Sequence, residues 1–157
     1  MDVNEQIAIT WLTEVKKMFI QSELYFGQYN SDIDILAVSI IDQLLWDCEI
    51  KVRTGTTNMC KSSFDNIINN FNCPDRANII FAVNQNKLAL KKKLIISQKY
   101  LGETPQTIKR WEAAFTLKNI DVIYFDTVIK ELSDFSSSCS KTTNVIIQTL
   151  KLSSSTA

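Results

Sequence analysis

Two strand-like stretches separated by only a few residues constrain the fold more than any other feature of the chain. The stretch 33–40 is apolar almost throughout after Asp34, and the stretch 46–53 alternates apolar and charged residues. Both patterns are typical of β-strands, and the gap near Asp42 and Gln43 is too short for a crossover connection. The two stretches are therefore expected to form an antiparallel hairpin.

Charged residues share one face of the second strand. Because side chains alternate along a strand, Glu49, Lys51 and Arg53 point to one side and the intervening apolar residues to the other. If the charged face is covered, these groups must be paired or functional. If it is solvated, they form an ordinary cross-strand salt bridge, and the sequence leaves this alternative open.

The register of the hairpin decides whether Asp34 joins this charged face. It does so when the numbers of paired residues add to an odd total. A turn centred between the two strands pairs Asp34 with Lys51, and a shift of two residues pairs Asp34 directly with Glu49. Either register places the charged groups about 5–8 Å apart at Cβ, close enough to share an ion.

The rest of the chain predicts an α/β domain with a mixed sheet flanked by helices on both faces, followed by additional C-terminal helices and a strand. The patterning predicts helices at 3–21, 59–72, 88–101, 105–117 and 127–135, and further strands at 24–29, 77–83 and 121–125. Residues 1–152 are expected to form a single domain, with a Ser-rich connector at about 133–144. Residues 145–152 form a helix or an edge strand, and 153–157 are expected to be a disordered tail.

The sequence contains no histidine. This excludes Ser-His-Asp and Cys-His catalysis and a histidine general base, so hydrolysis must depend on carboxylates, lysine and, where present, a metal ion. The four cysteines form no CxxC pair, and the expected state is reduced thiols rather than a structural zinc site. They are Cys48, Cys60, Cys73 and Cys139.

No apolar stretch approaches the roughly 18 residues of a membrane-spanning helix. The N-terminal segment is acidic before it is basic and has no apolar core of the kind that a signal peptide requires. The expectation is therefore a cytoplasmic protein without membrane association.

Two carboxylates and a lysine on the hairpin suit phosphodiester hydrolysis. Asp34 and Glu49 can hold Mg²⁺ or Mn²⁺ through oxygen ligands, and the main-chain carbonyl of Ile50 can supply a further ligand. Such an ion acidifies a bound water and withdraws charge from the phosphate. The ammonium group of Lys51 can orient the water or neutralise charge in the transition state. Asp32 shares a face with Asp34 and is the alternative metal ligand.

The bipartite motif of the PD-(D/E)XK, or restriction-endonuclease-like, phosphodiesterase superfamily resembles two segments of this chain, SDIDILAV and WDCEIKVRT. The element order, from the first helix to the strand expected at 77–83, is similar to the αβββαβ core of that family. The resemblance implies that Asp34, Glu49 and Lys51 are the catalytic residues and that Glu14 is the first-helix carboxylate. No proline precedes the aspartate, a variation that the family tolerates.

The distribution of charge bears on a nucleic-acid partner. The chain has 17 basic and 17 acidic residues, so its net charge is zero, but residues 87–110 carry seven basic residues against the single acid Glu103. This segment is either a face that contacts DNA phosphates or a solvated helix surface. The residues proposed to contact nucleic acid are Arg53, Lys91, Lys92, Lys93, Lys109 and Arg110.

The sequence hypothesis is a magnesium-dependent DNA endonuclease. A homodimer is plausible, because cutting both strands of a duplex requires two active sites. Two alternatives stay open: a catalytically silent nuclease fold that serves as a DNA-binding or assembly module, and a nuclease subunit that cuts only with a partner nuclease or recognition subunit.

Overall fold

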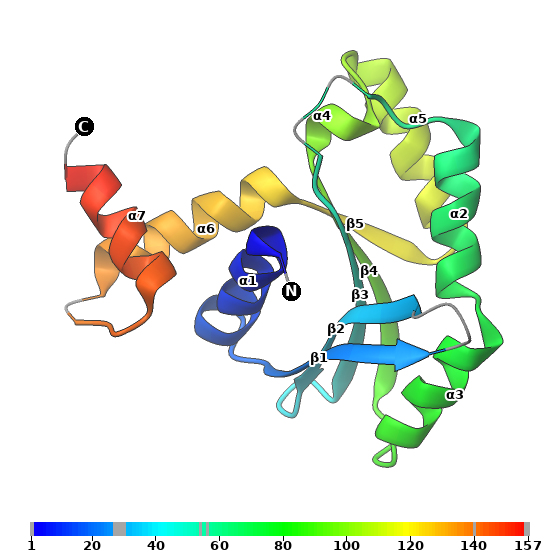
Figure 1. The fold of residues 1–157 in the computed structure, drawn as a ribbon, viewed down its shortest axis with the longest axis horizontal. Helices are drawn as coiled ribbons and strands as arrows, with labels where there is room; N and C mark the ends of the chain where they lie inside the picture. Colours follow the sequence, from blue (N-terminus) through cyan, green and yellow to red (C-terminus); the bar gives the residue numbers. More distant parts are fainter. Residues whose placement is uncertain (1, 27–30, 54, 56, 140, 156–157) are drawn as a thin grey trace.

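A five-stranded mixed sheet forms the centre of the molecule (Figure 1). The computed structural model describes residues 2–26, 31–53, 55, 57–139 and 141–155. In space the strands follow their order in the sequence, with β1 to β3 antiparallel and β3 to β5 parallel. Their bounds are β1 (Phe19–Phe26), β2 (Ser31–Ser39), β3 (Leu44–Lys51), β4 (Ala89–Ile96) and β5 (Ile120–Tyr124).

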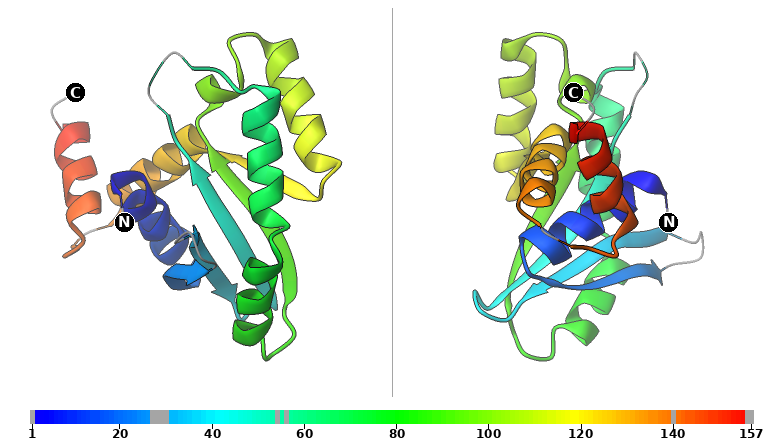
Figure 2. Two further views of the ribbon diagram at one scale, coloured as in Figure 1. Left: turned by 45° about the vertical axis from the view of Figure 1, so that its right-hand side comes forward. Right: turned by 90° about the vertical axis from the view of Figure 1, so that its left-hand side faces the viewer.

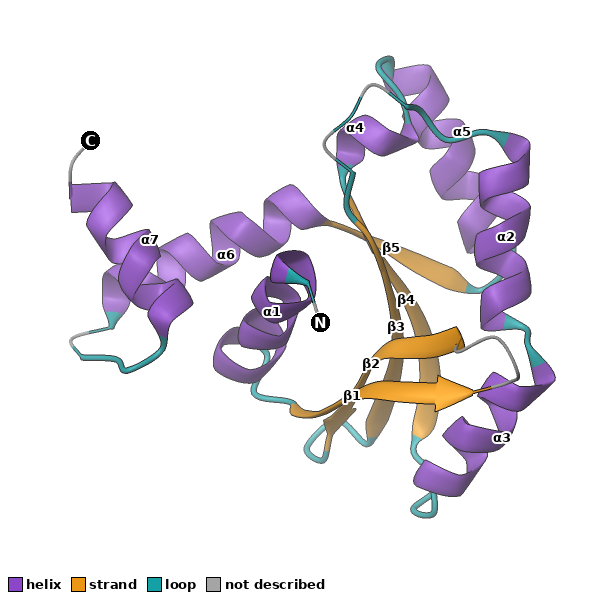
Figure 3. Cartoon of the chain, viewed as in Figure 1, coloured by secondary structure: helices purple, strands orange, loops and turns teal. Residues whose placement is uncertain are grey.

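Helices cover both faces of the sheet (Figures 2 and 3). α1 and α6 pack on one face, α2, α4 and α5 pack on the other, α3 covers the lower end of that second face, and α7 lies against α6. No helix in the described ranges is long and apolar enough to cross a membrane. The bounds are α1 (Val3–Thr10), continued by a π-helical turn η1 (Trp11–Val15), α2 (Lys61–Phe71), α3 (Pro74–Val83), α4 (Gln98–Leu101), α5 (Pro105–Thr116), α6 (Phe125–Ser138) and α7 (Val145–Ser155).

The hydrophobic core lies in two layers, one on each side of the sheet. Trp11 and Leu12 pack against Cys48 on the α1 side, whereas Phe71 and Phe115 lie on the α2 side. The alternating side chains of β3 therefore enter both layers. The face of β3 that carries acidic residues is covered, so water cannot solvate these charges and they need partners within the protein.

The predicted hairpin is confirmed as β2 and β3. Ile35 lies opposite Cys48 and Ser39 opposite Leu44, so the paired numbers add to an odd total. This register places Asp34 opposite Glu49, which is the direct pairing of the two that the sequence allowed. The main-chain ladder stops at Ile35, and beyond it the two strands separate while β3 continues to pair with β4 as far as its last residue.

The predicted strand at 77–83 is wrong, because this segment belongs to helix α3. Pro74 occupies the first turn of α3, where its missing N–H removes no hydrogen bond, and Cys73 is the extended N-cap residue. Arg76 and Ile80 are buried one helical turn apart, whereas Phe81 is 80% exposed. The segment 77–83 is an apolar run, which predicted a buried strand, but one side of it is exposed.

The predicted helix at 88–101 is also wrong, because the segment forms strand β4 and the short helix α4. Leu94, Ile95 and Ile96 are consecutive and fully buried, as expected for a parallel strand that is covered on both faces. Three lysines precede this run and made it look like an amphipathic helix. The strand that follows the three antiparallel strands β1, β2 and β3 is therefore β4 and not the segment 77–83.

The ends of the chain require smaller corrections. The first helix ends at Val15 rather than at residue 21, since Lys17 has a left-handed backbone with φ 56° that does not continue a helix. β1 consequently begins at Phe19, earlier than the predicted strand 24–29, and residues 27–29 of that prediction lie outside the described residues.

At the C-terminus, the Ser-rich connector predicted from residue 133 is helical as far as Ser138, as part of α6. Of the two options for 145–152, the helix is correct. This helix extends to Ser155, so the disordered tail is wrong for 153–155, and the last two residues lie outside the described part. The helices predicted at 59–72 and 105–117 and the strand at 121–125 are confirmed within two residues.

Candidate functional site

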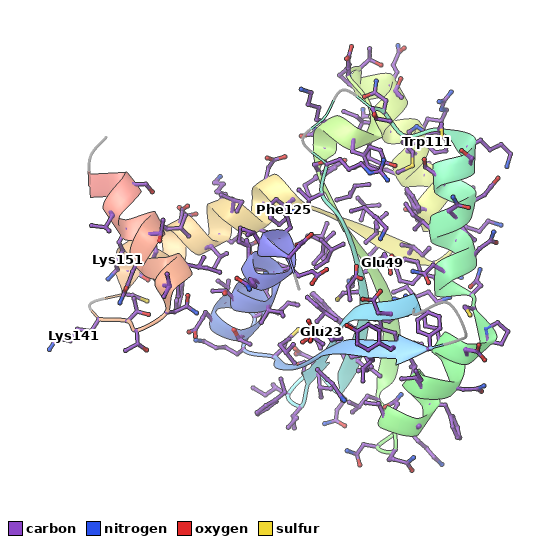
Figure 4. The ribbon with its side chains drawn as sticks, in the orientation of Figure 1. Glu23, Glu49, Trp111, Phe125, Lys141 and Lys151 are labelled. Atoms are coloured by element: carbon purple, nitrogen blue, oxygen red, sulfur yellow. The ribbon has the colours of Figure 1, made fainter. Side chains whose placement is uncertain are left out.

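A buried ion-pair cluster, formed by Asp47, Glu49 and Arg76, connects β3 to α3. The Arg76 side chain is 0% exposed, and it donates hydrogen bonds to Asp47 from Nη2 at 2.6 Å and from Nε at 3.2 Å. Its Nη1 donates to Glu49 Oε2 at 3.0 Å. Figure 4 shows Glu49 on the side of the sheet that faces α2. One guanidinium thus compensates two carboxylates that burial removes from water.

Lys51 is the second cation on Glu49. Its Nζ lies 2.6 Å from Glu49 Oε1, so each oxygen of this carboxylate has a cationic partner. Burial alone would lower the pKa of Lys51, but the charge and hydrogen bond of Glu49, together with Asp34, raise it above the ordinary value. In Arg76, too, burial lowers the pKa, and the hydrogen bonds and charges of Asp47 and Glu49 outweigh that effect. Both side chains are therefore held as cations.

Asp34 lies at the point where β2 and β3 separate. The main-chain N–H of Ile50 donates to Asp34 Oδ2 at 2.6 Å, so a side-chain carboxylate takes the place of a main-chain acceptor from β2. The N–H and C=O of one strand residue point toward the same neighbouring strand. The Ile50 carbonyl is therefore directed into the same gap, next to the Asp34 carboxylate.

The protonation of Asp34 reflects its neighbours. Burial raises the pKa of Asp34 to about 7, the charges of Glu49 and Asp32 raise it as well, and Lys51 and the Ile50 N–H oppose this rise. Burial also raises the pKa of Asp47, against the hydrogen bonds from Arg76. The pKa of a carboxylate rises beside a second carboxylate because the two negative charges repel each other. A further cation bound between them would therefore be stabilised.

The residues here that could hold a hard divalent cation are Asp34 and Glu49, through carboxylate oxygens, and Ile50, through its carbonyl. Both oxygens of Glu49 already contact a cation, Lys51 or Arg76, and a carboxylate oxygen in one such contact can accept another. Among the described residues, no group of three or more cysteine, aspartate and glutamate side chains is arranged to hold a metal ion. Two carboxylates are sufficient for Mg²⁺, which keeps several water ligands.

A cleft of about 250 Å³ opens beside Glu49 and Lys51, between α2, the end of β3 and α4. The side chain of Glu49 is 3% exposed and that of Lys51 is 34% exposed, so Lys51 is the more open of the two. The other residues that line the cleft are Arg53, Ser63, Asn66, Ile67, Asn70 and Tyr100. A substrate that reaches the charged groups from this side must enter between the helix and the sheet.

Two of the carboxylates proposed from the sequence, Asp32 and Glu14, do not belong to the group formed by Asp34, Glu49 and Lys51. Asp32 is half-buried on β2, and its charge is the weakest of the influences on Asp34. Glu14 is half-buried in η1, which follows the helix that packs on the opposite face of the sheet. In the part of the chain that the structure describes, no hydrogen bond or ion pair connects Glu14 to Asp34, Glu49 or Lys51.

The lysines of β4 do not form one basic face. Lys92 donates to Asn72 Oδ1 at 2.8 Å on the α2 side, whereas Lys93 lies 4.4 Å from the ring centre of Trp46 on the other side and pairs with Asp121. Strand alternation causes this separation, and a helix would have kept these residues together. Lys91 is exposed at the start of β4, and Lys109 and Arg110 are exposed on α5. Arg53 is the member of the proposed set that lines the cleft.

Asp47 and Arg76 were missed from the sequence. Asp47 has the same parity as Glu49 on β3, so the alternation that grouped Glu49 with Lys51 contained the signal for it. A covered face with two carboxylates also requires a buried cation. Nothing in the sequence identifies Arg76 as that cation, because its position depends on how α3 packs against the sheet.

Comparisons with known proteins leave the function open. No family model matches the chain, and no curated protein matches it. The crystal structure of a protein of unknown function, AF1548, is similar with a TM-score of 0.49 and 12% sequence identity. The match covers 80% of this chain and 59% of that one, so this chain spans less than two thirds of the other protein. No conclusion about activity follows from it.

Replacing Arg76 by methionine is expected to lower the free energy of unfolding by about 3–5 kcal/mol, because two buried carboxylates lose their partner. Urea denaturation measures the change. Lys61→Met is the matched control, since Lys61 makes an exposed ion pair with Asp65 and its loss should leave stability almost unchanged. If both variants unfold at the same urea concentration, the buried ion-pair cluster does not stabilise the fold.

Asp34→Asn is expected to stabilise the protein in a pH-dependent way. The pKa of Asp34 in the folded protein is about 7, above the ordinary value of 3.8, so the folded state binds this proton more tightly than the unfolded state does. Stability is therefore lost as the pH rises from about 4 to about 7. Asparagine removes the charge and keeps an acceptor for the Ile50 N–H.

In EDTA, the gain in stability of Asp34→Asn over the wild type should be small near about pH 4 and grow up to about pH 7, with an upper limit of about 4 kcal/mol set by the shift of the Asp34 pKa from 3.8 to about 7. Denaturation at several pH values measures it, with Asp134→Asn, an exposed aspartate of α6, as the control. A gain that is the same at every pH would contradict the assignment.

Proposed function

We propose that the chain is a metal-dependent phosphodiesterase of the restriction-endonuclease-like type that hydrolyses the DNA backbone. The observation that carries the proposal is the meeting of Asp34, Glu49 and Lys51 where β2 and β3 separate, beside a cleft. Glu49 lies 2.6 Å from Lys51, and Asp34 accepts the N–H of the residue between them. Two carboxylates and an ammonium group at this spacing suit phosphodiester hydrolysis.

The order of the elements supports the proposal. A helix, a three-stranded antiparallel meander, a helical crossover and a strand parallel to β3 follow one another from α1 to β4. This order is similar to the αβββαβ core expected from the motif resemblance, with β4 in the role that the sequence had given to 77–83. The helices and the strand β5 that follow are additions to this core.

Each residue of the site has a distinct role in the proposed reaction. Asp34, Glu49 and the Ile50 carbonyl would hold Mg²⁺ or Mn²⁺. When bound, the ion acidifies a water molecule and withdraws charge from the phosphate. The ammonium group of Lys51, which faces the cleft, orients the attacking water or donates to a phosphate oxygen in the transition state. Arg76 fixes the orientation of the Glu49 carboxylate from the buried side.

Cleavage assays test the proposal. Purified protein is incubated with supercoiled, linear, single-stranded and branched DNA in Mg²⁺ or Mn²⁺. Lys51→Ala is expected to reduce the cleavage rate by about 10²–10³-fold, because a preorganised donor to the transition state is lost. Lys130→Ala, an exposed lysine on α6, serves as the control and should cleave as the wild type does. Far-UV circular dichroism checks that both variants are folded.

The outcomes separate the candidate functions. Cleavage that is lost in Lys51→Ala supports the proposal. Binding of DNA without cleavage by the wild type favours a silent DNA-binding or assembly module instead. A wild type that neither binds nor cleaves any of these substrates, or a Lys51→Ala variant as active as the wild type, contradicts the proposal.

A further inference from the structure

The wall of the cleft opposite the charged groups is neutral. It is formed by Ser63, Asn66 and Asn70, which are three and four residues apart and so lie on one side of α2. Phe64, Ile67 and Phe71 occupy the neighbouring side, which packs into the core. α2 therefore presents hydroxyl and amide groups to the cleft rather than lysines.

These polar groups have unused hydrogen-bonding capacity. In the ranges that the structure describes, neither side-chain amide of Asn66 and Asn70 has a hydrogen-bond partner. Each amide offers two donors and an acceptor oxygen. Such groups match the donors and acceptors on the Watson–Crick edges of nucleobases, which the partner strand occupies in a duplex and which are available in an unpaired strand.

The other wall supplies a cation and an aromatic ring in a fixed position. The Arg53 guanidinium lies 5.0 Å from the ring centre of Tyr100. The main chain of Arg53 is held by Ser97, whose hydroxyl accepts the Arg53 N–H at 3.4 Å and donates to the Arg53 carbonyl at 3.2 Å. A planar guanidinium placed in this way can contact a phosphate or stack on a base.

The size of the cleft limits what can enter it. Its volume of about 250 Å³ is below the 300–1,000 Å³ that is typical of small-molecule pockets. Two paired strands are too wide to enter a space of this volume, whereas the base or the phosphate of one unpaired nucleotide is small enough to enter it. Glu49 is almost fully buried in the wall of this space and Lys51 is partly exposed beside it, so a phosphate that contacts Lys51 from this side lies in the cleft.

We infer that the cleft is a binding site for one unpaired nucleotide, with Asn66 and Asn70 on the base or sugar and Arg53 on the phosphate. The substrate class is therefore an unpaired DNA strand rather than a continuous duplex. This inference rests on the proposed function for the role of Lys51 and Glu49, but the binding that it requires does not depend on catalysis.

Fluorescence anisotropy in EDTA tests the inference, because no metal-dependent cleavage can occur during the measurement. The probes are a labelled oligonucleotide without self-complementarity and the same oligonucleotide annealed to its complement. The wild type is expected to bind the single strand about tenfold more tightly than the duplex. In the double variant Asn66→Ala and Asn70→Ala, the affinity for the single strand should fall about tenfold and that for the duplex should stay unchanged.

Asn69→Ala is the matched control, since Asn69 is an exposed asparagine of the same helix that does not line the cleft. It should bind both probes as the wild type does. Equal or tighter binding of the duplex by the wild type overturns the inference, as does a double variant that binds the single strand normally.

The two proposals fail in different ways. Single-strand binding that depends on Asn66 and Asn70, without cleavage in Mg²⁺ or Mn²⁺, leaves the inference in place and removes the nuclease function. Cleavage that depends on Lys51, with a preference for continuous duplex, leaves the nuclease function in place and removes the inference.

Discussion

The contact between the buried guanidinium of Arg76 and two carboxylates of β3 is the interaction on which the rest of the site depends. β3 is a central strand with both faces covered, so Asp47 and Glu49 could not lie there as charges without an internal cation. Replacing such a buried ionic group by apolar residues is often neutral or stabilising. Stability alone therefore does not account for it; in the proposed function, its role is to hold the Glu49 carboxylate in one orientation.

A second departure from regular structure lies directly opposite Glu49. The Asp34 carboxylate accepts the Ile50 N–H in place of a main-chain acceptor, and the ladder between β2 and β3 ends there. β1 is irregular at the same level: Glu23, which faces Asp34 in the register, has a left-handed backbone with φ 58°. Sheet irregularities often lie next to functional sites because they redirect side chains. Here the irregularity lets the Asp34 carboxylate take the place of a main-chain acceptor for the Ile50 N–H, next to Glu49.

The parts of the fold and of the site that could be predicted from the sequence are those that depend on residues close together in the chain. The hairpin, its odd register and the grouping of Asp34, Glu49 and Lys51 follow from alternation and a short connection, which are properties of neighbouring residues. The segments 77–83 and 89–96 are both short apolar runs, and periodicity does not distinguish a buried strand from a buried helix in such cases. The segment 89–96 forms a strand that pairs in parallel with β3. The segment 77–83 belongs to the helix α3, whose Arg76 forms ion pairs with Asp47 and Glu49.

The neutral charge of the chain agrees with the way its cations are arranged. Lys92 and Lys93 point to opposite faces of β4 and contact Asn72 and Asp121, so they do not combine into a broad positive surface. Proteins that bind duplex DNA through many phosphates rely on such a surface, and their affinity falls steeply with salt. In this chain the cations at the cleft are Lys51 and Arg53, beside neutral amides. A ligand bound there would be selected by short-range hydrogen bonds and shape more than by long-range attraction, which suits a site that accepts one nucleotide unit rather than the whole width of a duplex.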